Sequence, residues 1–344
     1  MNFAVIFGGN SFEHEISIVS AITLKDKIKK HKLEFIYIDQ NRDLYLIEQT
    51  NMKSRYFADG EYKNAQKIEF TKGGFKYTKG LLKKEVFLKY DAVINLIHGK
   101  DGEDGKLAGI LEFYKIKAVT PNVEASAISY NKVLTKAYAK EIGVNVIDCE
   151  IITEPKSRFD FPIIIKPARL GSSIGVSVVK TQEEFDYAFD VAREFDDLII
   201  AEPFIEGIEE YNLAGCLAGG EFILSNIEKV EKSDFLDFEK KYMDFSRKNI
   251  ILSDVEEDLS NKIKSSFKKI YNTTFKKALI RCDFFVKEGS VYLNEINPIP
   301  GSMANYLFDD FDSVLETLAQ NLEFEKDITV NFEYINKIQM AKGK

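Results

Sequence analysis

The sequence predicts a mixed fold, in which an N-terminal parallel α/β domain is followed by two β-rich lobes. Strand, glycine turn and helix in succession typically open an α/β domain, whereas antiparallel paired runs indicate β-rich lobes. Residues 3–30 show the strand, glycine turn and helix pattern. Residues 161–179 and 279–296 show antiparallel paired runs. We expect the domains to span residues 1–120, 121–203 and 204–344.

The composition is that of an ordinary globular protein. The 344 residues carry 47 Lys and Arg and 55 Asp and Glu, which gives a net charge of −8. This acidic balance argues against a nucleic-acid or anionic-membrane partner, although a few well-placed lysines would suffice for a nucleotide. Three scattered cysteines, no basic leader and no apolar run of membrane-spanning length lead us to expect a cytoplasmic protein.

The N-terminal domain is expected to begin with a strand at 3–7, a turn at Gly8 and Gly9, and a helix to about Lys30. Further strands are predicted at 34–38 and 92–96. Because only two glycines stand together at the turn, the dinucleotide fingerprint is absent and we predict no NAD site.

A second glycine-rich turn, His98–Gly105, follows the strand at 92–96 and precedes a predicted helix that ends near Tyr114. Turns at this position in α/β domains bind ligands. On this segment alone, a flexible acidic loop is an equal alternative. A calcium loop is disfavoured, because Lys106 stands where such a loop requires glycine.

Thr120–Pro121 indicates a domain boundary, and a helical stretch to about Gly143 follows it and carries Lys132. Lys166 then closes an apolar strand and precedes the loop Gly171–Gly175. Backbone N–H groups and the hydroxyls of the two serines in this loop, Ser172 and Ser173, can wrap phosphate oxygens. The alternative is a mobile surface hairpin, but a lysine that ends an apolar run then lacks an anionic partner.

A helix is predicted to start with the capping box Thr181–Glu184, and the next strand ends at Glu202. The carboxylate of Glu202 can accept a hydrogen bond from the amino group of adenine. From these residues alone, however, a solvated acid at the sheet edge is the favoured interpretation.

The hairpin at 279–296 has one polar face. Side chains alternate along a strand, so Arg281 shares a face with Asp283, and Glu295 shares a face with Asn297. Two carboxylates and an amide oxygen, without cysteine or histidine, suit a hard cation such as Mg²⁺. The alternative is an amphipathic hairpin whose polar face meets water. The rigid Asn-Pro-Ile-Pro-Gly run that follows, ending at Gly301, favours the metal site.

Residues 231–249 mix charges and aromatic side chains without a clean period, and a long loop in a compact domain is usually functional, often as a lid. Lysines on two elements, a glycine–serine loop, an acid at a strand end and a hard-metal cluster together describe ATP with Mg²⁺, bound between two β-rich lobes.

These residues carry a resemblance that covers nearly the whole chain: it resembles the D-alanine–D-alanine ligase family of the ATP-grasp superfamily. The matching segments are Gly8–Ser17, His98–Gly105, Lys166–Gly175, Glu239–Tyr242 and Arg281–Gly301. The family implies an ATP-dependent ligase that phosphorylates one D-alanine and joins it to a second, in peptidoglycan precursor synthesis.

The resemblance also implies a role for each matching residue. Nucleotide-binding residues by similarity are Lys132, Lys166, Ser173, Glu202, Glu210 and Lys241, with Glu202 at the adenine and Glu210 at the ribose. Two Mg²⁺ ions, for which Mn²⁺ can substitute, would be held by Asp283, Glu295 and Asn297. Arg281 and the Gly301 N–H would stabilise the oxyanion. Glu15 would bind the ammonium of the first D-alanine and connect through Ser172 to Tyr242, with His98 nearby. Tyr306 and Leu307 would meet the second substrate.

Two positions depart from the family pattern: Leu236 stands where many members have a lid tyrosine, and Tyr306 where many have a serine. Tyr242 favours an amine over the hydroxyl of D-lactate as the second nucleophile. D-alanyl-D-lactate or D-alanyl-D-serine ligation and a non-catalytic ATP-binding regulator are the alternatives. The family suggests a homodimer.

Overall fold

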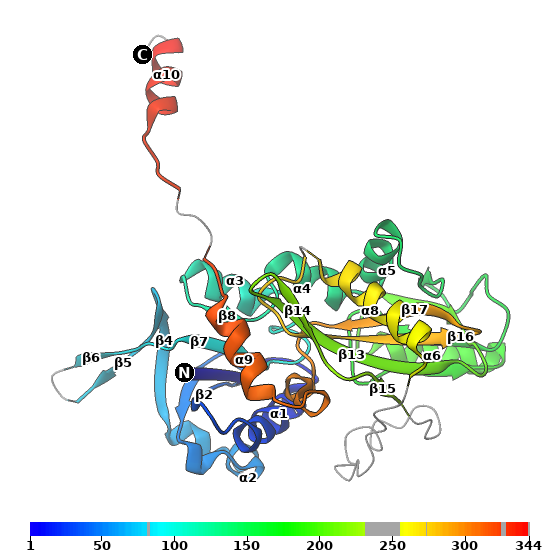
Figure 1. Cartoon of the computed structure of the whole chain (residues 1–344), viewed down its shortest axis with the longest axis horizontal. Helices are drawn as coiled ribbons and strands as arrows, with labels where there is room; N and C mark the ends of the chain where they lie inside the picture. The colour runs from blue at the N-terminus through cyan, green and yellow to red at the C-terminus, as the bar shows by residue number, and fades with distance from the viewer. Residues whose placement is uncertain (81–82, 231–254, 273, 325–327, 343–344) are drawn as a thin grey trace.

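The computed structural model describes residues 1–80, 83–230, 255–272, 274–324 and 328–342. Three β-sheets organise these residues, and Figure 1 shows the N-terminal sheet beside the two that follow. The predicted fold class, an α/β domain followed by two β-rich lobes, is confirmed.

The N-terminal sheet has eight strands in the order β6-β5-β4-β3-β2-β1-β7-β8. Its parallel half contains the four strands β2, β1, β7 and β8, and an antiparallel meander extends it from β3 to β6. The strands of the parallel half are β1 (Asn2–Gly8), β2 (Lys32–Ile38), β7 (Ala92–Asn95) and β8 (Ala118–Val119), and its helices are α1 (His14–Lys27) and α3 (Lys106–Phe113). The meander contains β3 (Leu44–Ile47), β4 (Gln66–Thr71), β5 (Gly74–Lys79) and β6 (Lys84–Leu88), with η1 (Gln49–Asn51), α2 (Ser54–Ala58) and η2 (Glu61–Asn64) before β4. Fully buried side chains along β1 and β2 form the centre of this domain.

The central sheet is antiparallel, with the order β11-β10-β12-β9. Its strands are β9 (Glu150–Ile152), β10 (Ile163–Pro167), β11 (Ser177–Val179) and β12 (Ile199–Pro203), and α6 (Gln182–Arg193) packs on it. The helical stretch predicted to Gly143 is two helices, α4 (Val123–Tyr130) and α5 (Lys132–Glu141). They are separate because the Asn131 side chain accepts a hydrogen bond from Val133 N at 3.0 Å and caps α5.

The C-terminal sheet has the order β14-β13-β16-β17, and β15 also pairs with β13. Its elements are β13 (Glu209–Ala218), β14 (Glu221–Leu224), β15 (Glu228–Lys229), β16 (Ile280–Lys287) and β17 (Ser290–Asn297), followed by η3 (Gly301–Leu307) and α9 (Phe311–Gln320); α8 (Glu257–Tyr271) precedes β16. The predicted hairpin at 279–296 is confirmed as β16 and β17.

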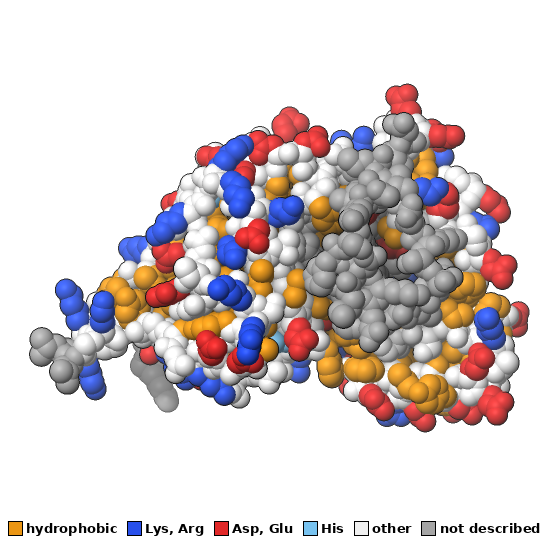
Figure 2. Space-filling model, turned by 90° about the horizontal axis from the view of Figure 1, so that it is seen from below, with side chains coloured by type: hydrophobic (Ala, Val, Ile, Leu, Met, Phe, Trp, Pro, Cys, Tyr) orange, Lys and Arg blue, Asp and Glu red, His pale blue; other side chains and the backbone are white. Residues whose placement is uncertain are grey.

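The N-terminal domain and the C-terminal lobe are joined by a shared hydrophobic core and by the contact of η3 with α1, whereas the central sheet and α6 form a core of their own. A last helix, α10 (Glu333–Ala341), stands away from the body in Figure 1. Acidic and basic side chains are interspersed over the face drawn in Figure 2, with hydrophobic side chains between them. Among the described residues, no helix has both the length and the apolar character needed to cross a membrane.

Candidate active site

The β16–β17 hairpin holds four predicted site residues at facing positions. Asp283 lies opposite Glu295, and Arg281 opposite Asn297, which confirms that they share one face of the sheet. The register shifts just after Asp283, where Asn294 has no partner on β16. Such a bulge re-aims side chains and is frequent beside active sites. Arg281 donates from Nε to Asp283 Oδ1 at 2.7 Å and from the guanidinium Nη2 to Oδ2 at 2.8 Å.

The donor set on this face fits a hard cation. Asp283 and Glu295 offer carboxylate oxygens, and the Asn297 amide has a buried Nδ2 end without a hydrogen-bond partner among the described residues. Turning that amide over would place its oxygen at the same point, which is a ligand type that Mg²⁺ prefers. No group of three or more His, Cys, Asp or Glu suited to a metal occurs in the described part of the chain. The Asn297 amide is therefore needed to complete the set.

Lys132 connects this hairpin to the central lobe. Its Nζ donates to Leu170 O at 2.6 Å and lies 3.9 Å from Glu295 Oε2. Burial lowers the pKa of Lys132, an effect that the nearby carboxylates of Glu295 and Glu13 oppose. Because it contacts both the hairpin and the backbone before the glycine–serine loop, Lys132 lies between the predicted metal and phosphate sites.

Glu202 on β12 is a buried acid shared by two lysines. Its side chain lies 2.8 Å from Lys166 Nζ through Oε2 and 3.0 Å from Lys136 Nζ through Oε1. Glu202 is only 2% exposed, so the interpretation as a solvated edge acid is wrong. Burial alone would raise the pKa of Glu202, but the two ammonium groups outweigh burial and lower it. Lys166 therefore has a buried anionic partner within the protein.

The prediction that Ser172 connects to Glu15 is wrong: Ser172 Oγ donates to Glu13. Glu15 is exposed, whereas Glu13 is 6% exposed. The physical reason is helical geometry, since two positions two residues apart at the start of α1 face opposite sides. Glu13 lies four residues before the buried Ser17, on the face that packs inward.

The Glu13 carboxylate fits between two glycines from other loops. A Cβ at Gly99, whose φ is +68°, would lie 2.6 Å from Glu13 Oε2, and a Cβ at Gly171 would lie 3.0 Å from Oε1. Oε2 is buried and has no hydrogen-bond partner among the described residues. Burial and the negative charge of Glu103 raise the pKa of Glu13 to about 7. This carboxylate can therefore accept a positively charged ligand group at Oε2, where the described residues place no hydrogen-bond donor.

His98 is buried next to this acid and connects it to η3. Its Nε2 lies 2.9 Å from Ser20 Oγ, which also accepts a hydrogen bond from Ser302 N at 3.2 Å. Ser302 and the two residues after it have left-handed φ values of 48°, 55° and 49°. Three consecutive non-glycine residues in this region store backbone strain, which is a feature of functional sites. Gly301, the predicted oxyanion donor, begins this strained turn.

Three further predicted residues, Tyr306, Leu307 and Glu210, lie on η3 and the C-terminal sheet. Tyr306 Oη donates to Glu228 Oε2 at 3.2 Å, and Glu228 also accepts from Asn212 Nδ2 at 2.9 Å. Leu307 is completely buried, and its carbonyl accepts a hydrogen bond from Asn226 N at 3.0 Å. Glu210 lies on β13 opposite Phe285. Ser173 stands in the glycine–serine loop with a φ of 59°. Lys241, Tyr242, Leu236 and the predicted lid at 231–249 lie outside the described residues.

Sequence reasoning missed Glu13 and Lys136, although both leave a signal. Glu13, Ser17 and Ser20 recur at the i, i+4, i+7 spacing of one helix face, and all three are buried. Lys136 stands one helical turn after Lys132 and therefore faces the same lobe. In both cases the side chain is identified by helical phase and not by residue type.

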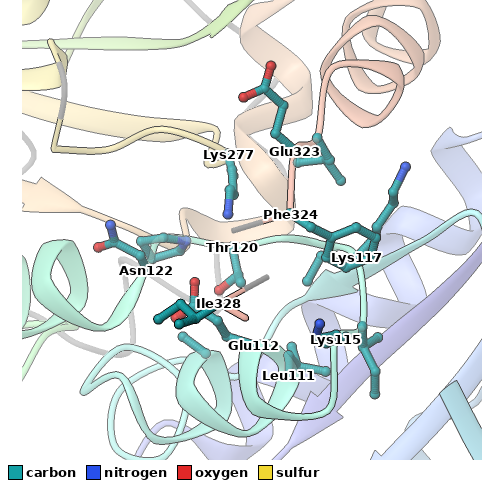
Figure 3. A pocket seen from close by; sticks show the side chains of 15 residues that line it. Leu111, Glu112, Lys115, Lys117, Thr120, Asn122, Lys277, Glu323, Phe324 and Ile328 are labelled. Carbon is teal, nitrogen blue, oxygen red and sulfur yellow. The ribbon is translucent and has the colours of Figure 1, made fainter. Parts of the chain in front are cut away.

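A surface pocket of about 280 Å³ lies apart from this site. Figure 3 shows Thr120, Lys277 and Phe324 around it, between β8, the start of α4 and the segment after α9. The ammonium of Lys117 lies 5.5 Å from the centre of the Phe324 ring. None of the site residues named above lines this pocket.

Comparison with known proteins agrees with the resemblance. The chain matches the family model of the D-ala D-ala ligase N-terminus over residues 2–121 and that of the D-ala D-ala ligase C-terminus over residues 128–311. D-alanine–D-alanine ligases from Campylobacter concisus and from a Nitratiruptor species are 53% and 54% identical to it. The first alignment covers 100% of this chain and 99% of the relative, and the second covers 99% and 100%.

Solved structures give the same result. A crystal structure of the D-alanine–D-alanine ligase from Helicobacter pylori is 50% identical, with a TM-score of 0.84 over 94% of this chain and 100% of that one. A D-Ala:D-Ser ligase from Enterococcus faecalis is 25% identical, with a TM-score of 0.73 over 93% of this chain and 97% of that one. From both family models, the full-length relatives and the shared fold, the chain belongs to the D-alanine–D-alanine ligase family, whose members are ATP-dependent ligases with the ATP-grasp fold.

Proposed function

We propose that this protein joins two D-alanines to D-alanyl-D-alanine, a peptidoglycan precursor, while ATP is converted to ADP and phosphate. The single observation that carries the proposal is the buried Glu13 carboxylate, whose Oε2 lacks a partner among the described residues. It lies next to the glycine–serine loop and near Lys132. An amino acid bound by its ammonium at Glu13 would present its carboxylate toward the lysine-lined phosphate region.

In the first step, a carboxylate oxygen of the bound D-alanine attacks the γ-phosphorus of ATP, and ADP leaves. Lys132, Lys166 and Lys241 hold phosphate oxygens, and the loop with Ser172 and Ser173 closes over them. Glu202 accepts from the adenine amino group and Glu210 from the ribose hydroxyls. Positioning and charge neutralisation are what phosphoryl transfer requires from a protein.

Asp283, Glu295 and Asn297 would hold two Mg²⁺, with Mn²⁺ as a substitute. When bound, these ions neutralise charge on the phosphates. In the structure, Arg281 donates a hydrogen bond to Asp283, and the Lys132 ammonium lies 3.9 Å from Glu295 Oε2. The Arg281 guanidinium and the Lys132 ammonium therefore contact the two carboxylates that would bind the metal. Both cations would then lie close to the phosphate oxygens.

In the second step, the amine of the second D-alanine attacks the acyl-phosphate carbonyl, and the tetrahedral intermediate then expels phosphate. Arg281 and the Gly301 N–H stabilise the developing oxyanion, a contribution of about 3 kcal/mol per donor. Tyr306 and Leu307 would meet the second substrate. His98 supports the first subsite, and Tyr242 would reach it from the lid and exclude water from the acyl phosphate.

The test is phosphate release with ATP and Mg²⁺ in the presence of D-alanine, L-alanine, or D-alanine with D-lactate or D-serine. Release with D-alanine alone, together with the dipeptide in a mass spectrum, supports the proposal. Release that requires D-lactate or D-serine would move the second substrate to that compound. No release with any of them would favour a non-catalytic ATP-binding protein.

We also propose a cytoplasmic location, because three free cysteines are compatible with a reducing compartment and ATP is available there. The homodimer and the domain spans 1–120, 121–203 and 204–344 remain predictions. Light scattering of the purified protein tests the first, and limited proteolysis the second.

A further inference from the structure

Lys136 is a buried lysine to which the proposed mechanism gives no role. It is 3% exposed and lies on α5, one helical turn after Lys132. Its Nζ donates to Ile147 O at 2.7 Å and lies 3.0 Å from Glu202 Oε1. Burying an ammonium group costs free energy unless it is paired with an anion, so the role of Lys136 depends on Glu202, the acid that it contacts.

That acid is shared with a phosphate-binding lysine. Ile164 of β10 lies opposite Glu202 on β12, so Lys166, two residues further on, is its diagonal neighbour on the same face. Lys166 Nζ lies 2.8 Å from the second oxygen, Oε2. One buried carboxylate therefore carries an ammonium on each oxygen.

The two lysines differ in what else they can reach. Lys136 is tied to the backbone at Ile147, whereas Lys166 stands at the end of β10, just before the glycine–serine loop. When Lys166 turns to a phosphate, a Glu202 without a second cation would become a buried and unpaired charge. Such a charge would oppose the movement.

We propose that Lys136 is a positioning residue for the nucleotide, because it remains the counter-ion of Glu202 while Lys166 binds phosphate. It also holds the Glu202 side chain as an ionised acceptor for the base. This inference rests on the proposed function, since it requires ATP in this site. The competing explanation is structural: Lys136 only fastens α5 to the backbone at Ile147.

The test measures binding of the non-hydrolysable analogue AMP-PNP with Mg²⁺ to the full-length protein by calorimetry. In Lys136→Met we expect the dissociation constant of AMP-PNP to rise by about tenfold or more, because Lys166 must then stay with Glu202. The KM for D-alanine should stay within about twofold of the wild-type value, which a nucleotide-specific effect requires. Lys136→Arg should restore most of the affinity because it restores the charge.

The matched control is Lys140→Met, one turn further along α5. Lys140 is exposed and lies 3.3 Å from Asp148 at the surface, so its loss should leave AMP-PNP binding unchanged. The second variant, Lys136→Met/Glu202→Gln, removes both charges and keeps a carbonyl acceptor for adenine. We expect it to bind AMP-PNP at least about threefold more tightly than Lys136→Met, because Lys166 is released.

A Lys136→Met protein with a lowered Tm but wild-type affinity for AMP-PNP would overturn the inference in favour of the structural explanation. A double variant that binds more weakly than Lys136→Met would also overturn it. Failure of the wild-type protein to bind AMP-PNP would overturn the proposed function, and this inference with it.

Discussion

Glu13 and Glu202 are two buried glutamates in one site, and their surroundings shift their pKa values in opposite directions. Glu202 carries two ammonium groups from the protein, which hold its pKa below the ordinary value. Glu13 has a serine hydroxyl and a nearby acid, and its pKa rises to about 7. Burial is common to both, so the difference comes from the cations that the chain supplies. Both oxygens of Glu202 already contact an ammonium group of the protein. Glu13 Oε2, by contrast, has no hydrogen-bond partner among the described residues and can bind a cationic ligand.

The largest effect is expected from removing Lys166, one of the two lysines that contact Glu202. Lys166→Ala should lower kcat by about 10³-fold, because a phosphate-binding charge is lost. Glu202 would keep Lys136 as its partner, so the fold should persist, as a thermal melt can verify. Steady-state phosphate release provides the measurement. Lys180→Ala, at an exposed position after β11, is the control and should behave as wild type. Near-normal turnover of Lys166→Ala would refute the phosphate assignment.

Removing the charge of Glu13 should instead weaken the binding of the first D-alanine. Glu13→Gln should raise the KM for the first D-alanine by about 100-fold, because a neutral amide is a poor partner for an ammonium group. Glu15→Gln is the matched control, since it removes an exposed carboxylate two residues away. If Glu15→Gln showed the larger effect, the assignment to Glu13 would be wrong. Initial rates over a range of D-alanine concentrations decide between them.

The raised pKa of Glu13 also predicts a pH effect on stability. Its folded-state pKa of about 7 exceeds the ordinary value of 4.5, so the protonated acid stabilises the fold. That contribution is fully present below pH 4.5 and is lost as the pH rises through about 7. Between pH 5 and 8, the wild type should lose about 2 to 3 kcal/mol of unfolding free energy relative to Glu13→Gln. Urea titrations of both proteins at the two pH values measure this; a constant difference between them would contradict it.

The smallest effect is expected from the aromatic contact next to Glu13. Phe12 lies edge-on to Phe195 with ring centres 5.3 Å apart, and so joins the Glu13 loop to the central lobe. Phe12→Ala should raise the KM for D-alanine about two- to fivefold. Phe113→Ala removes an exposed ring elsewhere in the N-terminal domain and should have no effect. Equal kinetics for both variants would show that the contact does not position Glu13.

The sequence predicts the hairpin site more fully than the helix-borne residues, for a physical reason. In β16 and β17, alternation alone assigns Arg281, Asp283, Glu295 and Asn297 to one face. At the start of α1, two glutamates flank a histidine, and only the phase of the helix decides which one is buried. The role of Lys136 depends on how α5 packs near β12, which no local pattern contains. Family resemblance identifies Lys241 and Tyr242, but the structure does not describe them.

The contrast between the two acids is tested most directly by measuring AMP-PNP affinity and the KM for D-alanine in both Glu13→Gln and Glu202→Gln. We predict that Glu13→Gln raises only the KM for D-alanine, whereas Glu202→Gln changes only the affinity for AMP-PNP. The result that would contradict this account is a pair of variants in which the same constant changes, because the two carboxylates would then serve one ligand.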